Sequence, residues 1–243
     1  MQNFYDADIT DIYDYLYPTP QNELENLAGF LLSRSSGKSL CELGVGTGRL
    51  ALPLADFGFN VTGIDTSPFM LERLKLKDTK KAVNVIAQDF IRDELPKNSY
   101  DAILLACNTI FVAQTLSQQQ DIFSNAARGL SESGIFVIET FNPIRYIRDS
   151  QQQLEMRHLA TNLILFEQIH IDIVQQTLHA NNLILRDGKS TLQYTQKIRY
   201  MTPFEMDAVA KSTGLVLRER TNDWSGNAFN ELASRIISVY ERE

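Results

Sequence analysis

Residues 40–50, with the sequence LCELGVGTGRL, decide the fold. An apolar segment ends at Glu42, three glycines then stand at alternate positions, and an apolar helical pattern begins near Leu50. Glycine has no Cβ, so this loop can turn sharply and let a ligand approach its backbone. An apolar strand, a glycine loop and a helix in this order are typical of a nucleotide site at the carboxyl edge of a parallel sheet.

A carboxylate follows the next apolar segment. Residues 61–64 read VTGI, and Asp65 comes directly after them. In nucleotide-binding folds, an acid at this place accepts hydrogen bonds from both hydroxyls of a ribose. The alternative is that Asp65 caps the helix predicted from Pro68. Together with the glycine loop, Asp65 indicates a cofactor that contains adenosine.

Two adenosine cofactors compete for this loop. The dinucleotide pattern G-x-G-x-x-G would place its third glycine at Arg49, where it is missing. The spacing of Gly44, Gly46 and Gly48 resembles motif I of the class I S-adenosylmethionine-dependent methyltransferases. The resemblance implies S-adenosylmethionine as the cofactor and S-adenosylhomocysteine as its product. A nicotinamide-dependent oxidoreductase is the remote alternative.

Three further segments resemble methyltransferase motifs. Residues 63–67 look like motif II, residues 87–90 like the adenine segment, and residues 100–106 like motif IV. The resemblance implies a set of cofactor-binding residues: Tyr5, Tyr13, Glu42, Gly44, Gly46, Gly48, Asp65, Thr66, Asp89, Phe90 and Ala106. Strand-end packing is the alternative for Glu42, and a turn role is the alternative for Asp89.

Strand and helix patterns alternate along the first part of the chain, which predicts an α/β fold with a parallel sheet. With the resemblance, we expect a Rossmann-like class I methyltransferase fold with a seven-stranded, mostly parallel sheet and a small antiparallel lid insert. Strands are expected at 39–43, 60–65, 84–88, 100–107, 134–140, 215–220 and 236–241, and core helices at 48–57, 68–77 and 117–130. Ser117 and Gln120 suit a capping box at the last of these helices.

The chain divides into four expected parts. Residues 1–37 form an amino-terminal helical cap, interrupted by Pro18 and Pro20, and residues 38–143 form the cofactor-binding core. Residues 144–201 form the lid over the acceptor, with antiparallel strands predicted from 163 to 200 and a hairpin turn at Asp187-Gly188. Residues 202–243 return to the core with a helix capped by Thr202 and two final strands.

Composition limits the function classes. The chain has 243 residues, 44% of them hydrophobic, and no apolar run approaches the roughly 20 residues of a membrane span. A net charge of −7 argues against a nucleic-acid partner and favours a neutral or cationic acceptor, although it could serve solubility alone. Cys41 and Cys107 read as reduced core residues of a cytoplasmic protein, and no ligand spacing indicates a metal. Monomer and homodimer both stay open.

Two short segments concern the acceptor. Tyr-Asp pairs occur at 5–6 and again at 13–14, and residues 107–114 read CNTIFVAQ. Both segments resemble bacterial small-molecule and peptide N-methyltransferases of the cypemycin type. This resemblance implies methyl transfer to an amine nitrogen of a small molecule or a peptide amino terminus. The alternative is an O-methyltransferase that acts on a carboxylate or hydroxyl of a small metabolite.

The catalytic candidates are Tyr13, Asn108 and His158. The aromatic ring of Tyr13 could attract the positively charged sulfonium of the cofactor. The alternative is that Tyr13 packs the amino-terminal helix onto the core. Asn108 follows a predicted strand and can line the binding crevice or form a turn. His158, placed just before the antiparallel strands, could orient or deprotonate an acceptor, unless it is simply exposed.

Overall fold

The computed structural model describes residues 6–148, 153–230 and 232–243, in which two separate sheets form. The larger sheet contains β1 (Ser39–Leu43), β2 (Asn60–Asp65), β3 (Val83–Ala87), β4 (Tyr100–Leu105), β5 (Leu130–Phe141), β10 (Leu215–Thr221) and β11 (Arg235–Arg242). Its strand order is β10-β11-β5-β4-β1-β2-β3. The first five strands along the chain pair in parallel, and only β11 and β10 run antiparallel to their neighbours. The expected seven-stranded, mostly parallel Rossmann-like sheet is confirmed.

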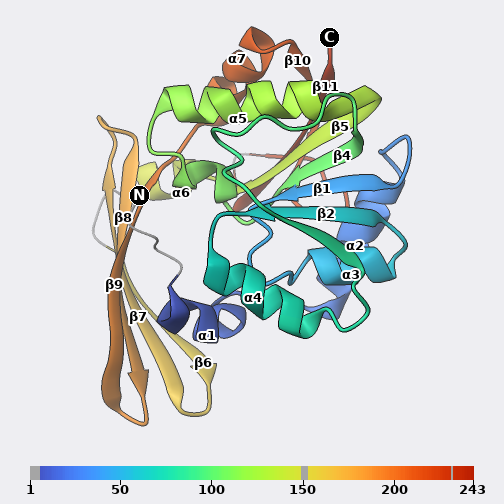
Figure 1. Cartoon of the computed structure of the whole chain (residues 1–243). Coiled ribbons are helices and arrows are strands. Elements are labelled where there is room, and N and C mark those ends of the chain that lie inside the picture. Colours follow the sequence, from blue (N-terminus) through green and yellow to red (C-terminus); the bar gives the residue numbers. More distant parts are fainter. Residues whose placement is uncertain (1–5, 149–152, 231) are drawn as a thin grey trace.

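Helices cover both faces of this sheet (Figure 1). One face carries α2 (Gln21–Leu32), α3 (Ala51–Asp56) and α4 (Pro68–Lys77), which bury leucines against β1, β2 and β4. The other carries α5 (Leu116–Gly129) and α7 (Pro203–Ser212). Because β1 lies between β2 and β4, the chain leaves β1 toward one side of the sheet and later returns on the other. That reversal opens a crevice at the carboxyl ends of these strands.

Local signals predicted most of these elements correctly. The bounds of β1, β2 and α4 agree with the sequence prediction residue for residue, and β3 is shifted by one position. β5 begins at Leu130, four residues before its predicted start. Two other boundaries were wrong because the backbone turns early. β4 ends at Leu105 because Cys107 and Asn108 have positive φ angles of 59° and 63°, and α3 begins only at Ala51 because Gly48 has a φ of 76°.

The start of α5 was also misplaced. Thr115, and not Ser117, is its N-cap, and the Thr115 hydroxyl accepts a hydrogen bond from the Gln118 N–H at 3.2 Å. The helix therefore begins two residues earlier than the capping box predicted. For α7, in contrast, the Thr202 hydroxyl accepts from the Glu205 N–H, which confirms the predicted cap.

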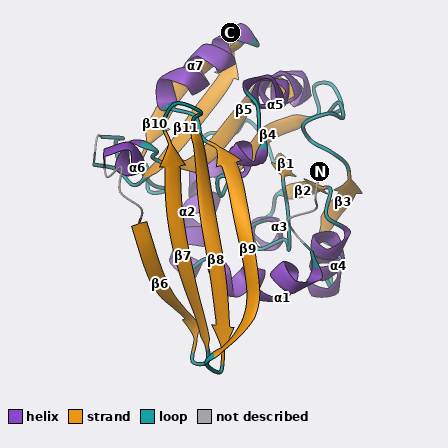
Figure 2. Cartoon of the chain, turned by 90° about the vertical axis from the view of Figure 1, so that its left-hand side faces the viewer, coloured by secondary structure: helices purple, strands orange, loops and turns teal. Residues whose placement is uncertain are grey.

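The second sheet is antiparallel and contains β6 (Gln153–Ala160), β7 (Leu163–Asp172), β8 (Thr177–Arg186) and β9 (Lys189–Arg199), side by side in chain order (Figure 2). The predicted turn at Asp187-Gly188 joins β8 to β9, with both residues at positive φ. β6 was not predicted. Its cavity-facing positions include Glu155 and Arg157, whereas its outward positions include the exposed Leu154 and Met156, which inverts the usual alternation of a half-buried strand.

We call this second sheet, β6 to β9, the lid sheet. An ion pair joins it to the core. Arg199, the last residue of β9, lies 2.7 Å from Glu205 of α7 and also contacts Gln119 of α5. Gln119 is fully buried and donates to the Arg199 carbonyl at 2.8 Å. These contacts fix the base of the lid beside 3₁₀-helix η1 (Thr109–Val112), which follows β4.

Two short helices complete the fold, α1 (Ala7–Leu16) and α6 (Ile144–Arg148). α1 lies against α4 of the core and β6 of the lid, so it closes the space between the two sheets from one end. Pro18 and Pro20 separate α1 from α2, as predicted. Among the described residues, no helix is long and apolar enough to cross a membrane.

Candidate active site

The glycine loop joins β1 to α3. Neighbouring side chains pack tightly against its first and third glycines, whereas there is free space beside its second glycine. Gly44, Gly46 and Gly48 have φ angles of 73°, 54° and 76°, which other residues adopt only with strain. A Cβ on Gly44 would lie 2.5 Å from Thr109, and one on Gly48 would lie 2.7 Å from Leu74. At Gly46, the nearest atoms to a Cβ would be 4.0 Å away. The middle of the loop therefore leaves room for a ligand.

Asp65 ends β2 beside this open position. Its carboxylate accepts hydrogen bonds from the Gly46 N–H at 2.9 Å and from the Ser67 N–H at 2.8 Å. Each carboxylate oxygen can accept a further bond, so Asp65 retains capacity for the hydroxyls of a ribose. Burial raises the pKa of Asp65, and these N–H groups oppose the rise. The N-cap of α4 is Ser67, so capping is not the role of Asp65.

Helix α1 covers the glycine loop. The ring of Tyr13 lies near Gly46, and Asp14 accepts from the Thr47 hydroxyl at 2.6 Å while pairing with Lys77 of α4. Burial raises the pKa of Tyr13 far above its usual value, so its phenol stays protonated. Tyr13 can therefore contact a ligand near Gly46 as a neutral aromatic side chain. Tyr5 lies outside the described residues.

Glu42 lies near the end of β1, just before the glycine loop, and provides a buried hydrogen-bond acceptor. It is only 5% exposed, and its Oε2 atom is buried without a hydrogen-bond partner among the described residues. Burial raises its pKa to about 8, and the nearby Arg49 opposes that rise. Leaving a buried acceptor unpaired is costly. A ligand with an ammonium or N–H group would satisfy Glu42, which fits the methionine end of S-adenosylmethionine.

The other residues predicted to hold the cofactor follow the carboxyl ends of β2, β3 and β4. Asp89 follows β3 and accepts from the Ile91 N–H at 3.0 Å, which is a turn interaction that leaves its second oxygen near Arg92. Phe90 is buried in the core, so it can offer only its backbone. Thr66 is exposed next to Asp65, and Ala106 is buried just after β4.

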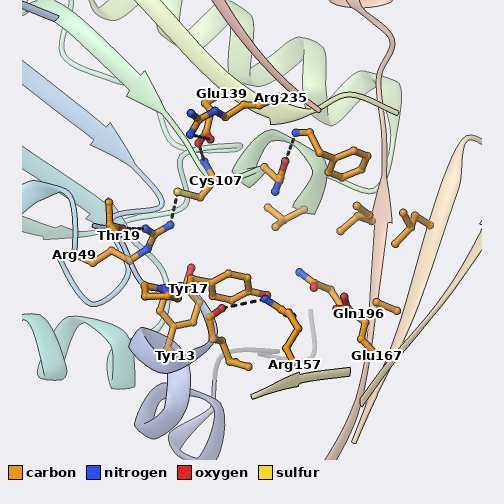
Figure 3. A pocket seen from close by; sticks show the side chains of 18 of the residues that line it. Tyr13, Tyr17, Thr19, Arg49, Cys107, Glu139, Arg157, Glu167, Gln196 and Arg235 are labelled. Atoms are coloured by element: carbon orange, nitrogen blue, oxygen red, sulfur yellow. Dashed lines mark hydrogen bonds and ion pairs between the residues drawn. The ribbon is translucent and has the colours of Figure 1, made fainter. Parts of the chain in front are cut away.

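A cavity of about 650 Å³ lies between the lid sheet and Arg49 and Leu50, which follow the glycine loop (Figure 3). Tyr13 borders this cavity and also lies near Gly46. Its core side includes Tyr13, Tyr17 and Asn108, and its lid side includes side chains from all four lid strands. The rings of Tyr13 and Tyr17 lie 5.0 Å apart. Cavities of this size bind small molecules or the end of a larger chain.

The structure brings two of the three catalytic candidates to this cavity. Tyr13 lines it, and so does Asn108, whose side-chain oxygen accepts from the Phe141 N–H at 2.6 Å. His158 is not part of the lining. It lies within β6 and not before the lid strands, and successive side chains of a strand point to opposite faces. Arg157 faces the cavity, so the neighbouring His158 is exposed on the outer face.

A second group of cavity residues was missed from the sequence. Arg49 contacts Cys107, and the Cys107 N–H donates to Glu139 of β5 at 2.6 Å. Arg235 of β11 lies 3.6 Å from Glu139 and 3.2 Å from Glu23. Cys107 thus lines the cavity beyond the end of β4 and is only partly buried against the core, whereas Cys41 is fully buried as predicted. Burial raises the pKa of the Cys107 thiol well above its usual range, so it stays protonated.

Charged residues on the lid face the same cavity. Glu155 of β6 stands directly opposite Glu167 of β7 in the strand register, and Arg157 is two residues further along β6. Burial raises the pKa of Glu167; the charge of Arg157 opposes this and that of Glu155 adds to it. In the sequence, the polar residues at positions 155, 157 and 167 were the signal that could have revealed these cavity-facing side chains. The same pattern is typical of a solvent-facing strand, so it did not identify a cavity.

Comparisons with known proteins agree with this geometry. Residues 41–138 match the family described as "Methyltransferase domain". The cypemycin N-terminal methyltransferase from Streptomyces sp is 24% identical over 210 residues, which cover 85% of this chain and 84% of the relative. The CcbJ methyltransferase structure from Streptomyces caelestis has a TM-score of 0.89 at 29% identity, with 98% of both chains covered.

A structure of CalS10 from Micromonospora echinaspora, an amino pentose methyltransferase bound to S-adenosylmethionine, has a TM-score of 0.76 at 17% identity and covers 100% of both chains. The open glycine loop, the acid at the end of β2 and the unpaired Glu42 oxygen fit the same cofactor. The chain is an S-adenosylmethionine-dependent methyltransferase with a Rossmann-like fold and a methyltransferase domain at residues 41–138.

Proposed function

We propose that this enzyme transfers the methyl group to an amine nitrogen of a small molecule or of a peptide amino terminus. The observation that carries the proposal is the pair of glutamates, Glu155 and Glu167, opposite each other on the lid wall of the cavity. Two like charges directly opposite on a sheet are destabilising, and a cation between them relieves the repulsion. An amine is a cation in water near neutral pH.

In this proposal the cofactor lies against Gly46 and Asp65, with Glu42 toward its methionine end. When bound, S-adenosylmethionine supplies an electrophilic methyl group on a sulfonium sulfur. As the new N–C bond forms and the C–S bond breaks, the acceptor nitrogen must have a free electron pair. An α-amino group has a pKa of about 8, so it has to lose a proton first.

Glu167 is the residue that we assign to receive this proton. Its raised pKa brings it closer to that of an amine than an exposed glutamate would be, which favours proton transfer. Tyr17 lines the cavity with its ring 5.0 Å from that of Tyr13, and burial raises the pKa of its phenol. Its buried phenol helps to exclude water and orient the acceptor.

The names of relatives support nitrogen as the methylated atom. One relative is a cypemycin N-terminal methyltransferase, and a protein of similar fold is an amino pentose methyltransferase. A peptide amino terminus and an amino sugar both offer an amine on a larger molecule. The cavity volume of about 650 Å³ admits either as a small molecule or as a chain end.

The proposal predicts that methyl groups labelled in the cofactor enter amines and not their blocked counterparts. We expect incorporation into free-amine peptides or amino sugars and none into the same compounds after N-acetylation. Mass spectrometry of the products would locate the methyl group, and its stability to mild base would separate an N-methyl product from a methyl ester. Incorporation confined to carboxylates or hydroxyls would contradict the proposal and establish the O-methyltransferase alternative.

A further inference from the structure

Arg157 presents an incompletely bonded guanidinium to the cavity (Figure 3). Its Nε atom is buried without a hydrogen-bond partner, and its Nη1 atom makes one long bond of 3.4 Å to the Leu16 carbonyl. Within the described ranges 6–148, 153–230 and 232–243, Arg157 forms no ion pair with a carboxylate. A buried donor without a partner costs free energy, so the site is unfinished without a ligand.

The other two arginines of the cavity differ from Arg157 in this respect. Arg49 contacts the Thr19 hydroxyl and Cys107, and Arg235 pairs with both Glu23 and Glu139. Their guanidinium groups belong to a network that joins α2, β5 and β11. Arg157 instead projects from β6 of the lid sheet into the part of the cavity beside Glu155 and Glu167, where we place the acceptor.

We propose that Arg157 binds an oxyanion of the acceptor, a carboxylate or a phosphate, so that the methylated molecule carries an amine and an oxyanion together. This inference rests on the proposed function and names its substrate class. The Nε and Nη2 donors of a guanidinium form a planar fork that matches two oxygens of such a group. Arg157 is suited to that recognition because its Nε has no hydrogen-bond partner among the described residues.

The charges next to Arg157 favour an acceptor with both groups over a simple anion. The lid wall carries two carboxylates, Glu155 and Glu167, and one guanidinium. A simple anion would meet repulsion from the two glutamates. A simple amine would leave the Arg157 donors unpaired. A molecule with an ammonium and an oxyanion satisfies both sets of groups, and when the oxyanion is a carboxylate it adds no net charge to the wall.

Matched pairs of small amines test this inference. Glycine, β-alanine, 4-aminobutyrate and triglycine would be compared with their carboxamides, and O-phosphoethanolamine with ethanolamine, so that the source of the oxyanion is distinguished. Binding would be measured by calorimetry on the protein saturated with S-adenosylhomocysteine, and turnover with S-adenosylmethionine. The wild type is expected to bind at least one oxyanion-bearing member roughly ten-fold or more tightly than its neutral partner.

Two variants assign this preference to Arg157. In R157Q the preference is expected to vanish through weaker binding of the charged member, whereas R157K should retain part of it because the charge stays and the fork is lost. R186Q removes an exposed arginine from the same sheet and should behave as the wild type. Unchanged affinity for S-adenosylhomocysteine would show that each variant is folded, and R157K gives the answer if R157Q does not fold.

The outcomes separate this inference from the proposed function. An oxyanion preference that survives in R157Q, or no preference and no binding in the wild type, overturns the role of Arg157. A preference that depends on Arg157 with the methyl group found on oxygen supports the inference and refutes N-methylation. Methylation of nitrogen in charged and neutral members alike supports N-methylation and refutes the inference.

Discussion

Replacing Glu42 with glutamine is expected to stabilise the protein at pH 8 by a few kcal/mol and to have little effect near pH 4.5. Burial raises the pKa of Glu42 from its usual value near 4.5 to about 8, so the folded state keeps a proton that the unfolded state has lost. The free energy of unfolding therefore falls as pH rises through this window, by up to about 1.4 kcal/mol per pH unit. Glutamine does not titrate, so the contribution disappears in Glu42→Gln.

Urea unfolding at several pH values between 5 and 8 would measure this effect. The difference in unfolding free energy between the wild type and Glu42→Gln should grow steadily across the window. Glu132→Gln is a matched control, because Glu132 is exposed on β5 and its replacement should leave the pH profile unchanged. Parallel profiles for the wild type and Glu42→Gln would show that Glu42 does not hold a proton in the folded protein.

The second large effect is expected at Asp65. Replacing Asp65 with asparagine should weaken the binding of S-adenosylhomocysteine by roughly 10- to 150-fold, because a hydrogen bond to a charged group contributes about 1.5–3 kcal/mol. Asparagine has one acceptor oxygen, and the Gly46 and Ser67 N–H groups already compete for the side chain at this position. The ribose hydroxyls would then lack a charged acceptor.

Calorimetric titration of the wild type and Asp65→Asn with S-adenosylhomocysteine would measure the change. Asp187→Asn is a suitable control, since Asp187 lies in the β8–β9 turn at a positive φ angle that asparagine tolerates well. The control should bind as the wild type does. Equal affinities for the wild type and Asp65→Asn would remove Asp65 from the cofactor site.

Much of the core could be predicted because its signals are local. The glycine loop, Asp65 and the Thr202 cap each depend on residues that are neighbours in the sequence, and each lies where the sequence placed it. β6 could not be predicted, because its cavity-facing positions carry Glu155 and Arg157 in place of apolar residues. Without β6, His158 was assigned to a connecting segment and its outward orientation could not be foreseen.

The acceptor side of the cavity depends on contacts between distant parts of the chain. Glu23 and Arg235 pair across 212 positions, and Cys107 meets Glu139 across 32. No spacing rule relates such residues before the sheet order is known. The lid pair Glu155 and Glu167 depends in the same way on strand register, which the missed strand concealed. Family resemblance predicted the residues of the cofactor site, whereas the proposal for the acceptor depends on residues that only the structure brings together.

A crystal structure of the complex with S-adenosylhomocysteine would show whether Gly46 and Asp65 bind the cofactor. We expect density for the nucleoside across Gly46, with ribose hydroxyls within hydrogen-bond distance of the Asp65 carboxylate and the homocysteine end toward Glu42. Density elsewhere in the molecule, or a ribose whose hydroxyls do not meet Asp65, would contradict this placement of the cofactor.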